Sequence, residues 1–380
     1  MIRVLGEPFE KLNIYTELKE WLASGDGFVN VTGTTGEGTD RVFMMQGFGD
    51  DASVRLILTY NDRRAEELYS DMKFYGRDVY MYPAKDILFF SADVHGNAIT
   101  RRRMEVLRRL ATGEPCTIIA TVDAMYDKIP ALSYMKKYVI NIHAAQSLDL
   151  DELKGKLVDL GYEKTDSVEE PGQFAIRGGI VDIFPLTEEC PYRIDMWDDE
   201  VDTIKTFDAE SQRSLENADE ITIYPAVEKN DGKDMVSFLD YFPEEKTLLF
   251  LDEPNHLAEN GEGVEEEYRQ SRMHREEKGE ANLPEQWLCG FQEVQKKLNK
   301  RNCVAVSSLS PRRSGWKFTD EFDLTVKSVD SYNSSFELLV KDLLQYKSQG
   351  YRIVLLSGSR TRAERLAKDL SEEGRECFLQ

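Results

Sequence analysis

The chain has 380 residues, enough for two to three domains, and 41% of them are hydrophobic. Its 70 acidic residues against 48 basic ones give a formal charge of -22, so the chain as a whole repels nucleic acid, and any such contact requires a local basic patch. The five cysteines and four histidines show no metal-ligand or disulfide spacing. No signal-peptide pattern or run of 18 apolar residues occurs, so we expect a cytoplasmic protein without membrane contact.

Strand-like and helix-like runs alternate in the first third of the chain. The strand-like runs are apolar and rich in β-branched residues, over 28–31, 55–60, 78–83 and 116–122. Amphipathic helix patterns lie between them, over 61–76 and 99–113 among others. This alternation predicts the α/β fold class, with a parallel sheet of the RecA-like, P-loop NTPase type.

The turn after the first strand has the glycine spacing of a phosphate-binding loop. Gly33 and Gly38 match G-x-x-x-x-G, but Thr39 and Asp40 stand where a working loop has Lys and Ser or Thr. Asp40 and Glu37 place carboxylates where phosphate charges would lie, and like charges within about 4 Å cost on the order of 1 to 4 kcal/mol each. We interpret the loop as degenerate, with turn geometry and no bound nucleotide.

A second motif resembles the Walker B strand of an ATPase. The mostly apolar run over 247–251 is followed by Asp252 and Glu253. In a motor such an Asp holds Mg²⁺ while the Glu orients the attacking water. The same pattern is typical of an ordinary strand-to-turn junction before Pro254. A nucleotide-driven, DNA-remodelling ATPase lobe is therefore the alternative interpretation. We expect no catalytic residue, no metal and no cofactor in this chain.

The strongest cationic cluster lies on the helix pattern over 99–113. It comprises Arg101, Arg102, Arg103, Arg108 and Arg109. The apolar positions of this pattern face the core, which leaves the arginines on the other faces. They form either a solvated face paired with acidic residues or a nucleic-acid patch made by Arg101, Arg102 and Arg103. No interleaved aromatic residues support base stacking, so we expect DNA contact to be weak or absent.

The pattern changes after about residue 131, where one helix is followed by strands without intervening helices. An α+β domain over 131–210 is thus predicted inside a discontinuous lobe of 1–130 and 211–330. The charged segment 259–280 is interpreted as a solvated helix or an excursion. Residues 331–380 have the pattern of a further α/β domain, with a strand over 351–358 between two helices. We interpret the chain as a fragment of a longer protein.

Strand alternation inside the predicted insertion gives the most informative constellation. In the run over 192–197, Arg193, Asp195 and Trp197 share one face, and the opposite face is apolar and should meet the core. Arg177, just before a glycine pair that suggests a bulge, falls on the same outward face. Trp and Arg dominate protein–protein hot spots, so Arg177, Arg193 and Trp197 are a predicted docking site. The alternative is that Trp197 is covered by its own domain and that Arg193 pairs with Asp195.

The stretch over 171–226, with "PGQFAIRGGIVDIFP" and "YRIDMW", resembles the module shared by UvrB and the bacterial transcription-repair coupling factor family. UvrB keeps an intact G-x-x-x-x-G-K-T and a long aromatic hairpin, whereas this chain has Thr39 and Asp40 and a short "YPAKDILFF" segment. The resemblance is therefore to the coupling-factor family. It covers essentially the whole chain, is strongest over 161–226 and is weak over 255–331. Residues 331–380 resemble the start of the small α/β linking domain that follows this module in the family.

This resemblance implies a function in transcription-coupled repair. The family's inserted domain docks the excision-repair protein UvrA, and the matching positions are Arg177, Arg193 and the aromatic Trp197, where the family often has Phe. The family's C-terminal domains bind RNA polymerase and hold the ATP- and Mg-dependent translocase. We expect this chain to recruit UvrA, to restrain the motor of its parent protein and to have no ATPase activity of its own. A DNA-binding module using the arginine cluster is a third interpretation.

Overall fold

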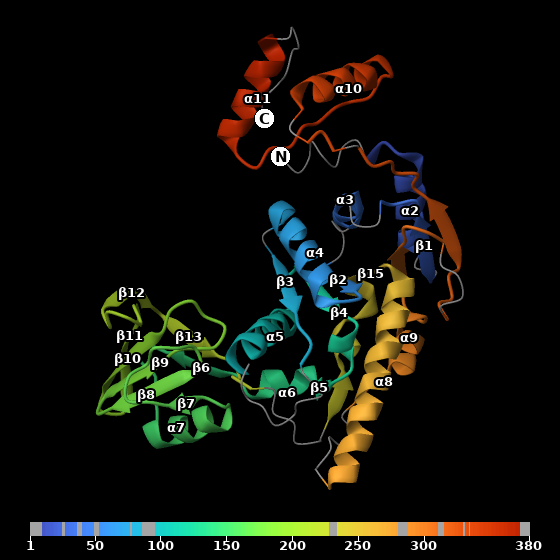
Figure 1. Cartoon of the computed structure of the whole chain (residues 1–380). Helices are drawn as coiled ribbons and strands as arrows, with labels where there is room; N and C mark the ends of the chain where they lie inside the picture. The colour runs from blue at the N-terminus through green and yellow to red at the C-terminus, as the bar shows by residue number, and fades with distance from the viewer. Residues whose placement is uncertain are drawn as a thin grey trace.

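The computed structural model describes residues 10–24, 27–35, 40–48, 53–76, 78–85, 96–227, 234–279, 288–310, 315–329, 331–333 and 335–372. Two separate large sheets and a pair of helices near the C-terminus organise these residues (Figure 1). Among them, no helix is long and apolar enough to cross a membrane.

The first sheet, among the described residues, has seven strands in the order β17-β1-β16-β15-β2-β4-β3, all parallel. They are β1 (Phe28–Thr32), β2 (Val54–Thr59), β3 (Val79–Tyr82), β4 (Cys116–Thr121), β15 (Thr247–Asp252), β16 (Cys303–Val306) and β17 (Asp320–Asp323). Successive residues of β2 enter two different apolar clusters, Leu56 and Leu58 in one and Ile57 in the other. Both faces of the sheet are therefore buried, as crossover helices require. This confirms the predicted α/β class.

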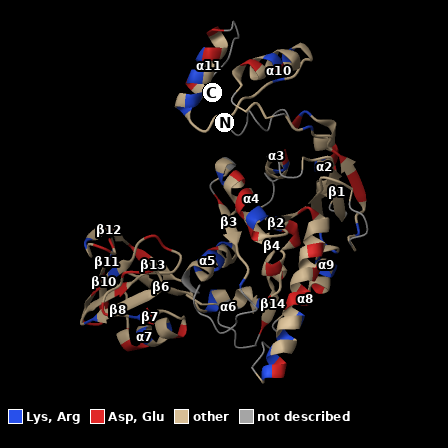
Figure 2. Cartoon of the chain, viewed as in Figure 1, with Lys and Arg blue, Asp and Glu red and all other residues tan. Residues whose placement is uncertain are grey.

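Helices cover both faces of this sheet. The cluster that contains Ile57 includes residues of α2 (Asn13–Ser24), α3 (Asp40–Gly47) and α4 (Asp62–Tyr75). The cluster that contains Leu56 includes residues of α5 (Gly96–Thr112), α8 (Pro254–Lys278) and α9 (Phe291–Leu298). The charged segment after residue 259 thus belongs to helix α8, whose buried residues all lie between Pro254 and Gly261. Its remaining turns are solvated, and Figure 2 shows acidic and basic residues along them.

The chain leaves the first sheet after β4 and returns at β15, and the residues between them build the second sheet (Figure 1). Its order is β12-β11-β10-β9-β8-β7, antiparallel except for the β7–β8 pair. The strands are β7 (Glu163–Lys164), β8 (Gln173–Arg177), β9 (Ile180–Ile183), β10 (Tyr192–Trp197), β11 (Glu200–Phe207) and β12 (Ser214–Ala218), and α7 (Leu150–Asp159) contacts β7. Because β12 pairs with β11, this sheet continues past residue 210, where the sequence pattern had placed the end of the insertion.

Two short antiparallel ribbons join the second sheet to the first lobe. On the way out the chain forms β5 (Lys128–Pro130), α6 (Leu132–Lys137) and β6 (Ile140–His143). On the way back it forms β13 (Glu220–Ile223) and β14 (Met235–Ser237), which pair with β6 and β5 respectively. The outgoing and returning segments are therefore hydrogen-bonded to each other at two successive levels.

The last described residues form α10 (Phe336–Ser348) and α11 (Arg360–Glu372), close to the two predicted helices. The strand predicted over 351–358 is not formed. A strand requires a neighbour for its backbone N–H and C=O groups, and the described residues provide none at this segment. Its apolar side chains are exposed accordingly, with Tyr351 at 61% and Leu356 at 54%.

Candidate functional site

The described part of the glycine-rich turn after β1 is hydrogen-bonded to a carboxylate of the chain itself. Gly33 has φ +79°, and a Cβ there would lie 2.7 Å from the backbone nitrogen of Thr325, so the turn requires glycine. The Thr35 backbone N–H donates to Asp40 Oδ2 at 3.0 Å, and the Thr35 hydroxyl donates to the other oxygen. Asp40 begins α3, and a helix N-terminus is where a phosphate loop holds its anion. Of the predicted loop residues, Gly38 and Thr39 lie outside the described part of the chain.

A buried arginine occupies the space between this loop and the Walker B-like pair. Arg41 is 0% exposed, and its Nη1 lies 2.6 Å from Asp252 Oδ1. Its Nη2 donates to Glu253, and its Nε donates to the Thr34 hydroxyl at 3.1 Å. One guanidinium therefore binds the loop and both predicted Walker B carboxylates at once.

Two further donors complete the coordination of Asp252. Arg64 Nε lies 3.0 Å from its Oδ2, and the Thr59 hydroxyl donates to the same oxygen at 2.9 Å. Burial alone would lower the pKa of Arg64, but its acidic neighbours, chiefly Asp252, outweigh burial and the pKa is raised. Glu253 also accepts the backbone N–H of Ser308 at 2.9 Å. The oxygens that would bind Mg²⁺ in a motor are thus engaged by protein donors.

This arrangement makes nucleotide binding costly. A nucleotide with Mg²⁺ would have to displace Arg41 from two carboxylates, and breaking a buried ion pair costs about 3–5 kcal/mol. No cluster of three or more His, Cys, Asp or Glu side chains suited to a metal occurs among the described residues. The local chemistry is that of a structural ion network.

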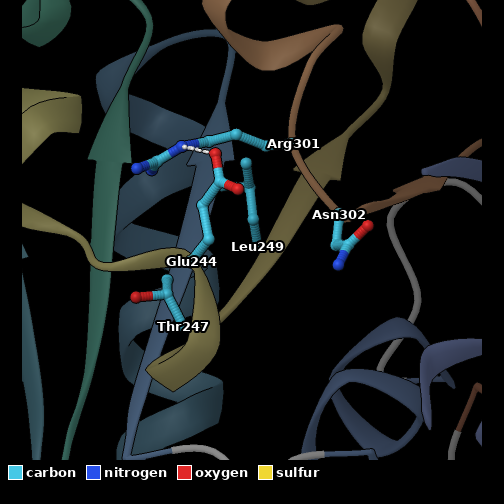
Figure 3. Close-up of a pocket in the computed structure, with 5 residues that line it drawn as sticks. All are labelled: Glu244, Thr247, Leu249, Arg301 and Asn302. Carbon is cyan, nitrogen blue, oxygen red and sulfur yellow. Dashed lines mark ion pairs between the residues drawn. The ribbon is translucent and has the colours of Figure 1, made fainter. Parts of the chain in front are cut away.

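A small hollow lies at the opposite, amino-terminal end of β15. Figure 3 shows its lining residues, with Glu244 and Arg301 pointing toward each other; they are Glu244, Thr247, Leu249, Arg301 and Asn302. It holds about 10 Å³, the space of one water molecule, whereas ligand pockets measure about 300–1,000 Å³. The buried Thr247 hydroxyl has no hydrogen-bond partner among the described residues, and a bound water would satisfy it. The hollow is too small for a nucleotide.

The predicted cationic cluster on α5 is mostly neutralised by acidic neighbours. Arg102 pairs with Glu66 at 3.1 Å, and Arg108 and Arg109 both pair with Glu105 and Glu114. Arg101 donates to the backbone oxygen of Glu188 at 3.2 Å. This matches the solvated, acid-paired face better than a nucleic-acid patch.

Arg103 does not belong to any surface patch, so its predicted nucleic-acid role is wrong. It is 0% exposed and lies over the Tyr82 ring, 4.2 Å from the ring centre. It pairs with Asp127 at 2.6 Å and donates to the Pro83 carbonyl at 3.0 Å. The pattern of α5 placed it outside the core because hydrophobicity does not reveal a buried, paired arginine.

The Arg–Trp surface of the second sheet is the other candidate site. Trp197 ends β10 and is 79% exposed, so its own domain does not cover it. It precedes a two-residue turn in which Asp198 has φ +58°, as the predicted tight hairpin requires. Arg177 ends β8 with a side chain 48% exposed, whereas the side chain of Arg193 is only 18% exposed.

Both arginines share a carboxylate that the sequence analysis missed. Asp182 on β9 is fully buried and pairs with Arg193 at 2.7 Å and with Arg177. The alternative pairing of Arg193 with Asp195 is wrong. All three guanidinium nitrogens of Arg193 donate to Asp182 or Gln212, and Asp195 Oδ2 instead lies 3.2 Å from Lys205 Nζ. One signal in the sequence could have indicated it: Asp182 is the polar residue of an otherwise apolar strand. In the structure it lies opposite Arg193 in the β9–β10 register.

The buried arginines Arg41 and Arg64, which both bind Asp252, were also missed. Arg41 directly follows the degenerate loop, so its position beside Asp40 was a local signal. Its partner Asp252 is 211 residues away in the sequence, and only the parallel order of β1, β16 and β15 brings them together. Arg64 lies in the first turns of α4, after β2, which is the neighbour of β15.

The fold is that of a RecA-like α/β lobe that carries an inserted domain with a sheet of its own. Residues 140–228 match the family described as the UvrB interaction domain.

Similarity to named proteins extends this match over most of the chain. The chain is 25% identical to the transcription-repair-coupling factor of Bacillus subtilis over 376 residues, 83% of the chain and 32% of that protein. It is 25% identical to that of Staphylococcus epidermidis over 85% of the chain and 32% of that protein, and 31% identical to that of Staphylococcus haemolyticus over 50% of the chain and 16% of that protein. The chain thus spans about a third of the length of the curated relatives it matches. These matches confirm the resemblance to the UvrB-like module of transcription-repair coupling factors.

Proposed function

We propose that this chain docks UvrA through the surface made by Arg177, Arg193 and Trp197. The observation that carries the proposal is the indole of Trp197, which is 79% exposed at the same end of the sheet as Arg177. This surface lies in the segment that matches the UvrB interaction domain. An exposed aromatic anchor beside a half-exposed arginine is typical of a binding hot spot.

In the protein of which this module is part, UvrA docking would bring excision repair to a stalled RNA polymerase. The support is the name shared by the relatives, transcription-repair-coupling factor, over about a third of their length. In this proposal the polymerase contact and the ATP-driven translocase belong to the rest of the parent protein. In the same proposal the module regulates that motor.

The proposal assigns no ATPase activity and no cofactor to this module itself. Its support is Arg41, which holds Asp252 and Glu253 in the position where Mg²⁺ and nucleotide would bind. The rival, a nucleotide-driven DNA-remodelling lobe, requires these carboxylates to be free. Isothermal titration calorimetry of the chain with MgATP separates the two, because micromolar binding would support the rival.

UvrA binding is the direct test. We expect a chain carrying Arg177→Ala and Arg193→Ala to lose UvrA in a pull-down and to weaken binding at least about tenfold in calorimetry. The matched control is Glu220→Gln, which removes a carboxylate from an exposed pair with His143 on the neighbouring ribbon. Unchanged UvrA binding by the double variant would refute the proposed docking surface.

A further inference from the structure

We infer that Asp182 is the positioning residue of the docking surface, and that it makes Arg177 the arginine that meets an acidic group on the partner. This inference rests on the proposed function. Asp182 lies on the central strand β9, opposite Arg193 on β10 and opposite Ala175 on β8. Its Oδ1 accepts from Arg193 Nε at 2.7 Å, and its Oδ2 accepts from Arg193 Nη2 at 2.9 Å and from Arg177. One buried carboxylate therefore holds both guanidinium groups.

The environment of Arg193 identifies it as a support for the surface. Besides Asp182, its Nη1 donates to the backbone oxygen of Gln212 and its Nη2 to the side-chain oxygen of Gln212, both at 3.3 Å. Its guanidinium lies 4.5 Å from the centre of the Phe207 ring. The hydrogen bonds that Arg193 donates to Asp182 raise the pKa of Arg193. All three nitrogens are thus engaged within the chain, which leaves little for a partner to bind.

Arg177 has the opposite character. Its Nη2 is held by Asp182, and its Nη1 donates to the backbone oxygen of Asp166 at 3.3 Å. Its Nε donates to no described residue, and almost half of its side chain is exposed. The guanidinium is fixed at one edge and open at the other, which is the arrangement that receives a carboxylate from outside.

The group formed by Asp182, Arg177 and Arg193 carries a positive net charge. Two guanidinium groups and one carboxylate leave a net charge of +1, and Arg177 is its more exposed member. On the other side of Trp197, the turn carries the exposed carboxylates of Asp198 and Asp199. The surface therefore fits a partner segment with an apolar recess for the indole, a carboxylate facing Arg177 and basic groups facing the turn.

A double-variant cycle in UvrA binding tests the positioning role. Asp182→Asn and Arg177→Ala are each expected to weaken binding of the 380-residue chain about tenfold, and the combined variant about tenfold to twentyfold rather than hundredfold. Such coupling is expected only if Asp182 acts through Arg177, because a general loss of stability would multiply with the Arg177 effect. Glu220→Gln serves as the carboxylate-to-amide control, and circular dichroism checks folding.

Two results would contradict the positioning role of Asp182. Wild-type affinity of a folded Asp182→Asn chain, or losses that multiply to about a hundredfold, would overturn the inference. If Asp182→Asn does not fold, Arg193→Lys takes its place in the same cycle, because lysine keeps a cation beside Asp182 and loses the two-point geometry. NMR of the arginine side chains needs no UvrA: Asp182→Asn should speed the solvent exchange of the Arg193 Nε–H. A chain that does not bind UvrA at all, yet shows this change, refutes the proposed function and keeps Asp182 as the group that orders the arginines.

Discussion

Replacement of Arg41 by methionine should destabilise the first lobe strongly, because Glu253 has no second cation among the described residues. Arg41 is fully buried and binds Thr34, Asp252 and Glu253. In Arg41→Met, Asp252 keeps Arg64 and a hydroxyl, but Glu253 keeps only one backbone N–H. Removing one partner of a buried ion pair costs about 3–5 kcal/mol. At about 2–4 °C per kcal/mol for a unit of this size, the unfolding midpoint should fall by about 10 °C.

Thermal unfolding followed by circular dichroism measures this loss, and hydrogen exchange of the β15 amides assigns it to the first lobe. Arg63→Met is the matched control, since Arg63 is 85% exposed in its pair with Glu67 and should leave the midpoint unchanged. The double variant Arg41→Met with Glu253→Gln should recover part of the loss, because no unpaired charge then remains. A midpoint equal to wild type in Arg41→Met, or no recovery in the double variant, would refute the reasoning.

Three further results are expected. Trp197→Ala should change the free energy of unfolding by less than about 0.5 kcal/mol while weakening UvrA binding about tenfold, and a large loss of stability would show that the indole packs on its own domain. Arg103→Met should lower the unfolding midpoint of the lobe, whereas Arg102→Met should not, because only Arg103 is a buried partner of an ion pair; equal midpoints would contradict this. Burial raises the pKa of the Cys116 thiol to about 11 from 9.0. The buried neutral thiol therefore contributes fully to the free energy of unfolding below pH 9, and this contribution is lost as the pH rises towards 11. The stability difference between wild type and Cys116→Ala, from denaturant titrations, should narrow over that range, and a constant difference would argue against the shift.

The main elements of the fold could be predicted because their signals are local. The β-branched runs of β2 and β4 and the amphipathic patterns between them require only neighbouring residues to be recognised. The segment 351–358 shows the limit of this reasoning. Its composition is that of a strand, but strand formation depends on a partner elsewhere in the chain.

The candidate sites show the same division between local and distant information. Alternation along β10 was sufficient to place Arg193 and Trp197, yet the carboxylate that organises the arginines depends on the register between strands. The role of Asp182 could be recognised only from the structure, where the turn at Gly178 pairs β8 with β9 in a defined register. Likewise, the loop could be interpreted as degenerate from Asp40. The guanidinium that binds the Walker B-like carboxylates could not be predicted, since Arg41 and Asp252 meet only through the sheet order.

The paired ribbons at the base of the second sheet attach the inserted unit to the first lobe at a single place. Because β6 pairs with β13 and β5 with β14, the entry and exit of the insertion lie side by side. Such a cassette can be moved between host lobes without altering either fold, since both ends enter at one place. A single proteolytic cut within it would also leave both pieces attached, one through each arm of the ribbon. Release of the docking surface from its lobe would therefore require two cuts.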